Sequence, residues 1–215
     1  MKADFWHERW QNGQIGFHRD DVNPYLIRFW PKMDTHRNSH VLVPCCGKSH
    51  DLVWLAEQGC RVTGLELSSL AVEEFFETNG LDAEVEEIEG GRRHSAGSIR
   101  IYEGDMFNIG LSGMGAVDHV YDRGALIAMP PDMRDQYSAL VHTLAPDAST
   151  LLVTLDYPPE EMNGPPFPLT EREVGKRFAT HSIACVFCED ILDEDAFFRE
   201  KGLTRLDESV YVITT

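Results

Sequence analysis

One stretch of the chain alternates twice between a strand pattern and a helix pattern, and this constrains the fold more than any other feature. An apolar run at residues 40–44 leads through a loop into a segment with helical spacing that begins at Asp51 and stops at Gly59. A second apolar run, residues 61–67, is followed by a helix that Ser68 is expected to cap. This order predicts a parallel sheet with helices on both faces.

The rest of the chain continues the alternation. Strands are expected near residues 98–103, 116–121, 150–155, 180–188 and 204–214, and helices near 131–144, 170–178 and 193–201. The acidic segment 82–97 is predicted to form an exposed hairpin or edge excursion. A length of 215 residues predicts one domain, residues 1–215.

Residues 1–35 precede the first long strand pattern and are too few to form a domain. Trp6 and Trp10 are four residues apart and therefore share a face of a predicted helix. A polar connector with two glycines then leads to Phe17, and a second helix is expected from Asn23 to Met33. Packing on the core would explain the aromatic residues, but the connector favours an aromatic arm or lid.

The charge balance excludes some partners. The chain has 36 Asp and Glu against 19 Lys and Arg, a net charge of −17, which repels nucleic acids and anionic membrane surfaces. No segment approaches the ~20 apolar residues of a membrane span, and the N-terminal residues lack the apolar run of a signal peptide. We therefore expect a soluble cytoplasmic protein, and nothing in the sequence demands more than a monomer.

The five cysteines are an odd number, which favours free thiols: Cys45, Cys46, Cys60, Cys185 and Cys188. Cys185 and Cys188 form a C-x-x-C motif inside a strand pattern, where an offset of three predicts side chains on opposite faces. Neither a helix N-terminus that would activate a thiol nor a second ligand pair for zinc accompanies the motif. No metal site is expected.

The loop after the first strand only partly imitates known phosphate-binding motifs. Gly47-Lys48-Ser49 matches the end of a P-loop, but Leu42 stands where that motif needs its first glycine. A dinucleotide loop would need two further glycines in the same turn.

A ligand that contains adenosine and a positive sulfonium fits the strand ends better. Ligands of open parallel sheets bind beyond the carboxyl ends of the strands. Gly47 would let the backbone approach the ligand, and Glu66, 19 residues later, would accept hydrogen bonds from two ribose hydroxyls. Asp105 and Met106 would hold the edge and face of the adenine.

Five motifs together resemble the thiopurine S-methyltransferase family over the chain from about residue 5 to the C-terminus. They are Phe5-Trp6-x-x-x-Trp10-x-x-Gly13-x-x-x-Phe17-His18, Val43-Pro44-Cys45-Cys46-Gly47-Lys48-Ser49-x-Asp51-Leu52-x-Trp54-Leu55-Ala56, Gly64-Leu65-Glu66-Leu67-Ser68, Tyr121-Asp122-Arg123-Gly124-Ala125-Leu126 and Gly164-Pro165-Pro166-Phe167. Cys45 stands where vertebrate members carry leucine, which indicates a bacterial-type member.

The resemblance implies a fold, a donor and a substrate class. The fold is the Rossmann-like, seven-stranded, mostly parallel sheet of class I S-adenosylmethionine-dependent methyltransferases, with an N-terminal helical cover. S-adenosylmethionine is the methyl donor, and no metal is needed. The acceptor is an aromatic or heterocyclic thiol, and bacterial members are also associated with selenium and tellurium compounds.

The resemblance also implies roles for individual residues. Trp6, Trp10 and Phe17 would belong to the cover over the donor. The expected contacts of donor or acceptor are Cys45, Gly47, Glu66, Asp105, Met106 and Arg123. We expect Arg123 to be the catalytic residue, which favours the ionised acceptor electrostatically instead of taking a proton. An ion pair of Arg123 with Asp122, or with an acid at the start of a helix, is the simpler alternative.

Two other functions stay open at this stage. A metalloid-binding protein could use soft ligands, either Cys45, Cys46 and His50 or the C-x-x-C pair, without catalysing transfer. A methyltransferase of oxygen or nitrogen acceptors could share the fold, although an oxygen acceptor would usually want a metal or a general base.

Overall fold

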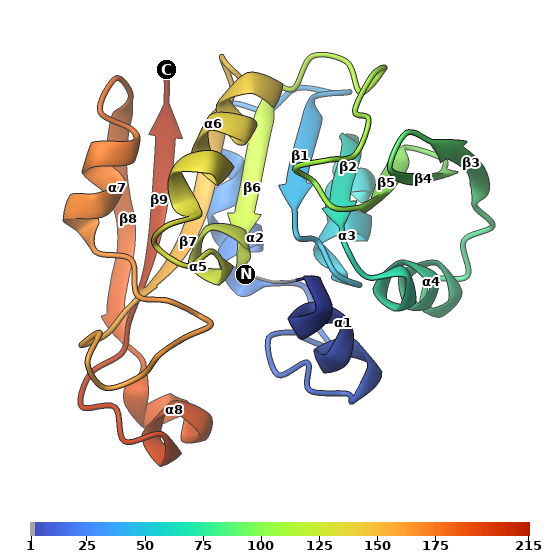
Figure 1. Ribbon diagram of the computed structural model, residues 1–215. Coiled ribbons are helices and arrows are strands. Elements are labelled where there is room, and N and C mark those ends of the chain that lie inside the picture. The colour runs from blue at the N-terminus through green and yellow to red at the C-terminus, as the bar shows by residue number, and fades with distance from the viewer. Residues whose placement is uncertain (1–2) are drawn as a thin grey trace.

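The computed structural model describes residues 3–215 and contains a nine-stranded mixed sheet with helices on both faces (Figure 1). The strands are β1 (His40–Pro44), β2 (Arg61–Glu66), β3 (Glu84–Ile88), β4 (Gly91–Ala96), β5 (Ile99–Gly104), β6 (His119–Arg123), β7 (Ser149–Asp156), β8 (Ser182–Asp190) and β9 (Asp207–Thr214). Their order across the sheet is β3-β4-β5-β2-β1-β6-β7-β9-β8. The five central strands, from β5 to β7, are parallel, which confirms the predicted α/β fold.

The expected count of seven strands is wrong, because the acidic hairpin joins the sheet. β3 and β4 form the predicted hairpin, and β4 pairs antiparallel with β5. Close pairing requires glycine at position 91, since a Cβ atom there would lie 2.0 Å from the carbonyl oxygen of Glu103. The hairpin therefore adds two strands at one edge of the seven expected strands.

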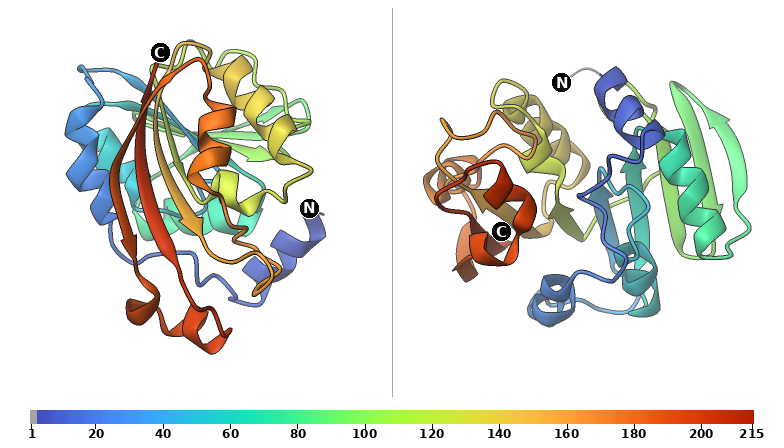
Figure 2. Two further views of the ribbon diagram at one scale, coloured as in Figure 1. Left: turned by 90° about the vertical axis from the view of Figure 1, so that its left-hand side faces the viewer. Right: turned by 90° about the horizontal axis from the view of Figure 1, so that it is seen from below.

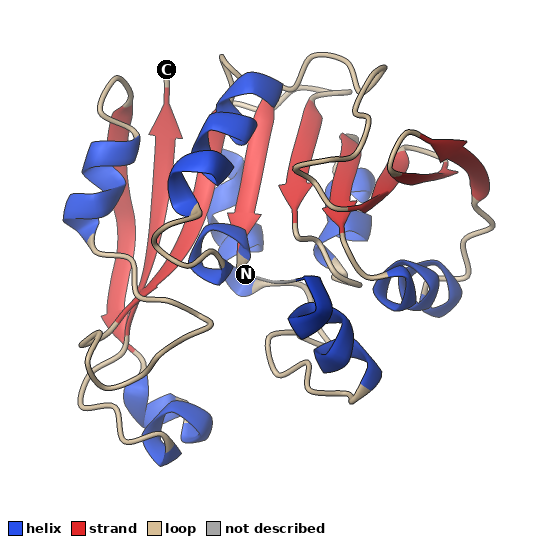
Figure 3. Ribbon diagram, in the orientation of Figure 1, coloured by secondary structure: helices blue, strands red, loops and turns tan. Residues whose placement is uncertain are grey.

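Helices cover both faces of the sheet (Figures 2 and 3). They are α1 (Ala3–Gln11), α2 (Pro24–Phe29), α3 (Asp51–Glu57), α4 (Ser69–Thr78), α5 (Ala125–Ala128), α6 (Arg134–Leu144), α7 (Glu171–Arg177) and α8 (Ala196–Glu200), with 3₁₀ turns at Trp30–Lys32 and Leu192–Glu194. Side chains of α2, α3 and α4 share a hydrophobic cluster with one face, and those of α5, α6 and α7 share another with the opposite face. Within residues 3–215 no helix is long and apolar enough to cross a membrane.

Helix α4 shows why these residues form these elements. The Ser68 hydroxyl accepts a hydrogen bond from the Ala71 backbone N–H at 3.3 Å, as expected of an N-cap. The buried side chains of this helix recur at helical spacing, Ala71, Val72, Phe75 and Phe76. One apolar stripe therefore packs against the sheet, and the remaining positions carry the acids of the helix.

The carboxyl ends of β1, β2, β5 and β6 lie at one end of the sheet, and α1 lies beyond that end (Figure 1). From β1 the chain continues to β2 and β5 on one side, and β6 later pairs with β1 on its other side. The gap between the loops after β1 and β6 is the topological switch point, where ligands of open parallel sheets bind.

A β-bulge in β8 overturns one expectation. Cys185 pairs with Tyr211 and Cys188 with Ser209, and the register shifts between Cys185 and Phe187. Because Ser209 and Tyr211 are two residues apart, they face the same side of β9. The extra residue, Val186, absorbs the odd offset. The two thiols therefore lie on the same face of the edge strand, not on opposite faces.

Candidate functional site

The first contact of the site joins the ends of the two neighbouring strands β1 and β2. The Gly47 backbone N–H donates to one carboxylate oxygen of Glu66 at 2.8 Å, and the Ser68 N–H donates to the other at 2.8 Å. Glu66 is buried, and burial raises its pKa while these backbone donors lower it in part. The acid thereby fixes the loop after β1 relative to β2.

Helix α1 covers this loop. Gly47 has φ +54°, and a Cβ atom there would lie 3.3 Å from the Trp10 ring, which is itself buried. Glycine is therefore favoured at position 47 both by the left-handed backbone and by the ring above it.

The aromatic residues of the arm form a cluster of their own. Phe17 lies edge to face with both Trp6 and Trp10, with ring centroids 5.7 Å apart in each pair. Phe17 is also 40% exposed, which is unusual for a large apolar side chain in a packed cluster. The sequence-predicted Trp6, Trp10 and Phe17 therefore lie together beyond the strand ends.

Arg123 connects this cluster to the sheet. One guanidinium N–H donates to the backbone carbonyl oxygen of Phe17 at 2.7 Å, across 106 positions of sequence. The neighbouring carboxylate, Asp122, accepts instead from the Tyr137 hydroxyl at 2.6 Å and from the N–H groups of Ala125 and Leu126. The Asp122 carboxylate thus accepts from the first two N–H groups of α5. The hydrogen bonds of Arg123 and Asp122 run to different partners.

The two cysteines of the loop after β1 are protonated thiols near neutral pH. Burial raises the pKa of Cys45 and of Cys46 well above the usual value, and the nearby Glu66 raises both further. Cys46 also packs where residue 64 must be glycine, since a Cβ atom there would lie 2.6 Å from its sulfur. Cys45 adopts φ +48° beside the strand end. This environment suits a packing role better than a nucleophile.

Asp105 and Met106 follow β5 at the same end of the sheet. The Asp105 carboxylate accepts from the Phe107 N–H at 3.0 Å and from the Asn108 amide at 2.6 Å, so it shapes its own turn. Met106 is half-buried and packs against the same hydrophobic cluster as Cys45. The structure therefore places both residues at the strand end, with Asp105 bonded to its turn.

Asp51 is a buried polar residue that sequence reasoning did not single out. Its carboxylate accepts from the Asn23 N–H at 2.7 Å and from the Tyr121 hydroxyl at 2.9 Å. These contacts tie the starts of α2 and α3 to β6, two residues before Arg123. The signal in the sequence was weak, because the partners are 28 and 70 positions away.

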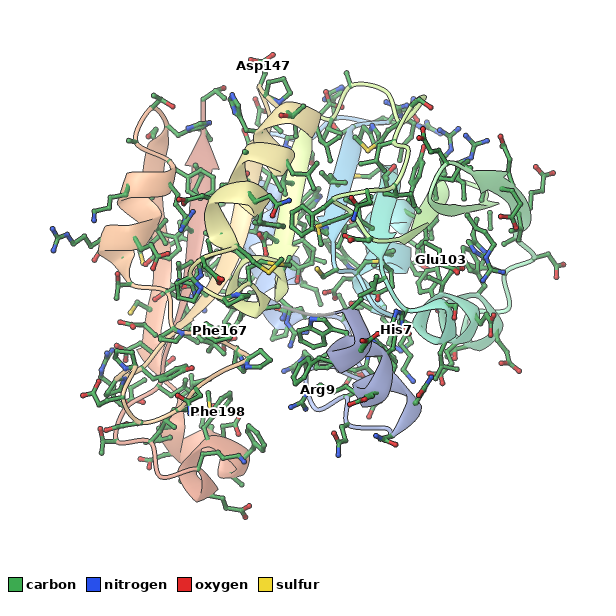
Figure 4. All side chains as sticks on the ribbon, in the orientation of Figure 1. His7, Arg9, Glu103, Asp147, Phe167 and Phe198 are labelled. Atoms are coloured by element: carbon green, nitrogen blue, oxygen red, sulfur yellow. The ribbon has the colours of Figure 1, made fainter. Side chains whose placement is uncertain are left out.

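Arg134 is the second residue that the sequence did not reveal. It is 1% exposed, and its guanidinium donates to both Glu173 oxygens at 2.9 Å and to the carbonyl oxygens of Phe167 and Pro168 at 3.3 and 2.9 Å. Arg134 therefore pins the loop between β7 and α7. Figure 4 shows Phe167 of this loop at the same end of the molecule as His7 and Arg9 of α1, with Asp147 at the opposite end.

The described part of the chain offers no cluster for a metal. Among residues 3–215 no group of three or more His, Cys, Asp or Glu side chains could hold an ion. A hollow of about 580 Å³ lies between α6 and α7, and Arg177 is among its lining residues, but it contains none of the predicted site residues.

The strand ends fit a nucleoside that carries a positive sulfonium. Each carboxylate oxygen has two acceptor positions, so Glu66 can receive ribose hydroxyls while it keeps its backbone donors. The Trp6, Trp10 and Phe17 rings provide π faces, which attract a sulfonium by ~0.5–2 kcal/mol.

The chain is similar to one family along its whole length. The family model described as thiopurine S-methyltransferase matches residues 1–215. A thiopurine S-methyltransferase of Pseudomonas paraeruginosa is 45% identical over 215 residues, which cover 99% of this chain and 99% of the relative. Another, from Bordetella petrii, is 46% identical over 213 residues, which cover 98% and 97%.

Solved structures of low sequence identity share the fold. An S-adenosylmethionine-dependent methyltransferase from Anabaena variabilis has a TM-score of 0.65 at 14% identity and covers 99% of this chain and 94% of that chain. The 1,6-didemethyltoxoflavin-N1-methyltransferase of Burkholderia thailandensis, solved with 1,6-didemethyltoxoflavin and S-adenosylhomocysteine bound, has a TM-score of 0.63 at 17% identity, over 99% and 87%. The architecture is thus that of S-adenosylmethionine-dependent methyltransferases.

Proposed function

The chain belongs to the thiopurine S-methyltransferase family, and on that premise we propose that it transfers a methyl group from S-adenosylmethionine to the sulfur of an aromatic or heterocyclic thiol. The observation that carries the proposal is the hydrogen bond from the Gly47 N–H to the Glu66 carboxylate, next to the Trp10 ring. It unites the backbone loop, the ribose acceptor and the aromatic cover that such a donor requires.

The proposed reaction is an in-line displacement. The acceptor thiolate forms a bond to the methyl carbon while the bond from that carbon to the sulfonium sulfur breaks, and the electron pair leaves with S-adenosylhomocysteine. Because the sulfonium is an excellent leaving group, the protein chiefly aligns the reacting atoms and excludes water. Alignment of this kind supplies ~7–11 kcal/mol.

Arg123 has the charge and the place to favour an anionic acceptor. Its bond to the Phe17 carbonyl holds it between the sheet and the aromatic cluster. A guanidinium carries five N–H donors, so one bond to the cover leaves capacity for a thiolate. Heterocyclic thiols ionise near neutral pH, and a positive charge stabilises the ionised form without a separate base. The proposal gives neither cysteine of the first loop a nucleophilic role, and Cys45 stays a predicted contact of the donor or acceptor.

Selenols are further acceptors that the same displacement includes, because selenolates are softer analogues of thiolates, and tellurium compounds stay an expectation from the family resemblance. The monomeric state and the cytoplasm as compartment stay predictions from composition and sequence.

Calorimetry with S-adenosylhomocysteine tests the donor site. We expect binding by the full chain, and a Glu66→Gln variant should bind about tenfold more weakly, since hydrogen bonds to a charged acceptor are stronger by ~1–1.5 kcal/mol. Glu74→Gln is the matched control, because Glu74 of α4 bonds the side chain of Lys48 in the same loop, whereas Glu66 bonds the Gly47 backbone N–H. A chain that does not bind S-adenosylhomocysteine has a different function.

An acceptor screen with thiols, selenols and tellurite follows, with methylation detected by mass spectrometry. Methylation of a heterocyclic thiol supports the proposal. A chain that binds the donor product but methylates only oxygen or nitrogen acceptors would contradict the proposed substrate class.

A further inference from the structure

The two exposed thiols of the C-x-x-C motif lie at the outer edge of the sheet. β8 is the edge strand at one side of the sheet, and within residues 3–215 its one strand neighbour is β9. Cys185 and Cys188 are both free and exposed. Three strands, β9, β7 and β6, separate β8 from β1, so the pair is remote from the donor loop.

The bulge gives this pair a common direction. In a regular strand an offset of three would separate the thiols, but Cys185 stands opposite Tyr211 and Cys188 opposite Ser209. The neighbouring residues support this assignment, since Val186 and Phe187 both pack into the hydrophobic cluster of the other face. The partner residues are two positions apart, which corresponds to a spacing of about 6.6 Å along the strand.

The electrostatic surroundings agree with a shared face. Burial raises the pKa of the Cys185 thiol, and Cys188 and Glu171 raise it further, so both groups are neighbours of Cys185. Burial likewise raises the pKa of Tyr211 to about 12, and both cysteines contribute. The Cys185 sulfur lies 3.2 Å from the Phe187 carbonyl oxygen, which fixes one thiol at the bulge.

We propose that Cys185 and Cys188 form a dithiol site that captures trivalent arsenic and similar thiophilic metalloids, independently of methyl transfer. Two thiols on one face at one strand's edge can bind a single soft atom together. With an organoarsenic diol, each S–H bond is replaced by an S–As bond, and each As–OH group leaves as water with the thiol proton. Two water molecules are released, and no electrons are transferred.

Other uses of the pair fit the geometry less well. A disulfide needs Cα atoms about 4.4–6.8 Å apart, and the same-face spacing of about 6.6 Å lies at the long end of that range, whereas a bridging atom spans a wider gap. A structural zinc site needs four ligands, and the described residues offer no group of three or more.

Phenylarsine oxide, which is a diol in water, is the probe for the experiment. The full chain is treated with it in excess 2-mercaptoethanol, and the tryptic peptide 178–199 is analysed by mass spectrometry. This peptide contains Cys185 and Cys188 and no other cysteine. We expect one phenylarsenic group on the peptide, resistant to the monothiol and removed by 2,3-dimercaptopropanol.

Three variants make the test specific to the shared face. Cys185→Ser and Cys188→Ser should each lose the resistant group completely. The matched control combines Cys188→Ser with Glu189→Cys, which keeps two thiols in the peptide but places the second on the face of Glu189. Glu189 is exposed and acts electrostatically on Tyr25 across that face. This control should also lose the group.

Two results would overturn the proposal. One is a wild-type peptide with no monothiol-resistant group in a chain whose circular dichroism shows it folded. The other is full retention by the control with thiols on opposite faces. Methyl transfer is measured separately, so failure of the dithiol site leaves the proposed function unaffected.

Discussion

Arg123 combines two duties at the scale of a single residue. It holds the carbonyl of Phe17 at 2.7 Å, and its charge faces the end of the sheet where an acceptor anion would lie. The sequence predicted a functional arginine at this strand end, but the hydrogen bond to the arm was not predictable, because it joins residues 106 positions apart. Any variant of Arg123 therefore affects charge and cover together.

Two substitutions of Arg123 test its charge, because one removes the charge and the other keeps it. We expect Arg123→Ala to lower turnover of an acidic thiol by about 10²-fold, the scale of losing one preorganised donor at a reacting charge. The loss should be greatest below the pKa of the acceptor, where the arginine has most effect on ionisation. Arg123→Lys keeps the charge and should recover part of the low-pH rate. An Arg123→Ala profile parallel to wild type at every pH would remove Arg123 from acceptor ionisation.

At the residue scale, the sequence indicated proximity where both residues belong to one local unit, and the expected ligand contacts of Gly47 and Glu66 stay predictions. Gly47 and Glu66 are neighbours in the βαβ pattern, so their spacing in sequence indicated their spacing in space. Asp51 and Arg134 were missed because their partners come from distant segments. Buried polar groups of this kind can be identified only from their hydrogen-bond partners, and the spacing of residues in the sequence does not reveal those partners.

At the scale of elements, the arm is the part most specific to the proposed donor. Deleting residues 1–17, of which residues 1 and 2 lie outside the described part of the chain, removes Trp6, Trp10 and Phe17. We expect donor affinity to fall about tenfold, in line with the loss of ~0.5–2 kcal/mol of cation–π attraction. Calorimetry with S-adenosylmethionine measures the loss, and far-UV circular dichroism checks that the sheet persists. Undiminished donor binding would rule out the lid role.

The loop between β7 and α7 provides the second prediction at this scale. Arg134 bonds both Glu173 and two carbonyls of the loop, whereas Arg177 bonds Glu173 without bonding those carbonyls. Arg134→Met should therefore raise the KM for the acceptor several-fold and leave donor affinity unchanged, because it frees a loop that lies at the same end of the molecule as α1 but makes none of the contacts of Gly47 or Glu66 (Figure 4).

Arg177→Gln is the matched control for the loop. It takes one partner from the same carboxylate but leaves the loop carbonyls bonded, so the acceptor KM should stay near wild type. If both variants change the acceptor KM equally, the effect comes from Glu173 and α7 and not from the loop. The unfolding temperatures of both variants show whether loss of the ion pair lowers the stability of the whole protein or affects the loop alone.

Element prediction failed at α5, for which no helix was expected, and where strand pairing decides the outcome. The acidic segment was expected as a hairpin and forms one, yet nothing in its own residues tells that β4 pairs with β5. The bulge at Val186 was also hidden, because an alternating strand pattern with one extra residue resembles an unbroken strand. The positions of most strands and helices follow from the local sequence pattern, whereas the pairing of each strand depends on the whole sheet.

At the scale of the molecule, the net charge of −17 and a few buried titratable groups set the dependence of stability on pH. His40 and His119 lie at the amino end of the parallel strands, away from the site, and burial lowers the pKa of both. Burial raises the pKa of Glu66 and Asp122. Because of the lowered pKa values, the two histidines bind fewer protons in the folded chain than in the unfolded chain. Because of the raised pKa values, the two acids bind more protons in the folded chain.

The direction of the pH dependence that His119 causes can be tested on its own. Its Nδ1 atom is buried without a hydrogen-bond partner among the described residues, and its ring lies 5.7 Å from that of Trp30. Between the lowered folded pKa and the unfolded value near 6.5, the unfolded chain binds a proton that the folded chain does not. The free energy of unfolding should therefore fall as pH drops below 6.5, by up to about 1.4 kcal/mol per pH unit from this residue.

The variant His119→Phe isolates this contribution from the acids, which titrate in the same range. A phenyl ring keeps the edge contact with Trp30 and has no proton to gain. The slope of the unfolding free energy against pH should therefore be less positive than in wild type by up to about 1.4 kcal/mol per pH unit, which corresponds to one bound proton. Urea unfolding from pH 7 to pH 5 measures both slopes. His142→Gln, on the exposed side of α6, is the control and should reproduce the wild-type slope, since its ring is exposed in either state. Identical slopes for wild type and His119→Phe would mean that His119 gains its proton without unfolding, and the pH dependence would then belong to His40 and the acids.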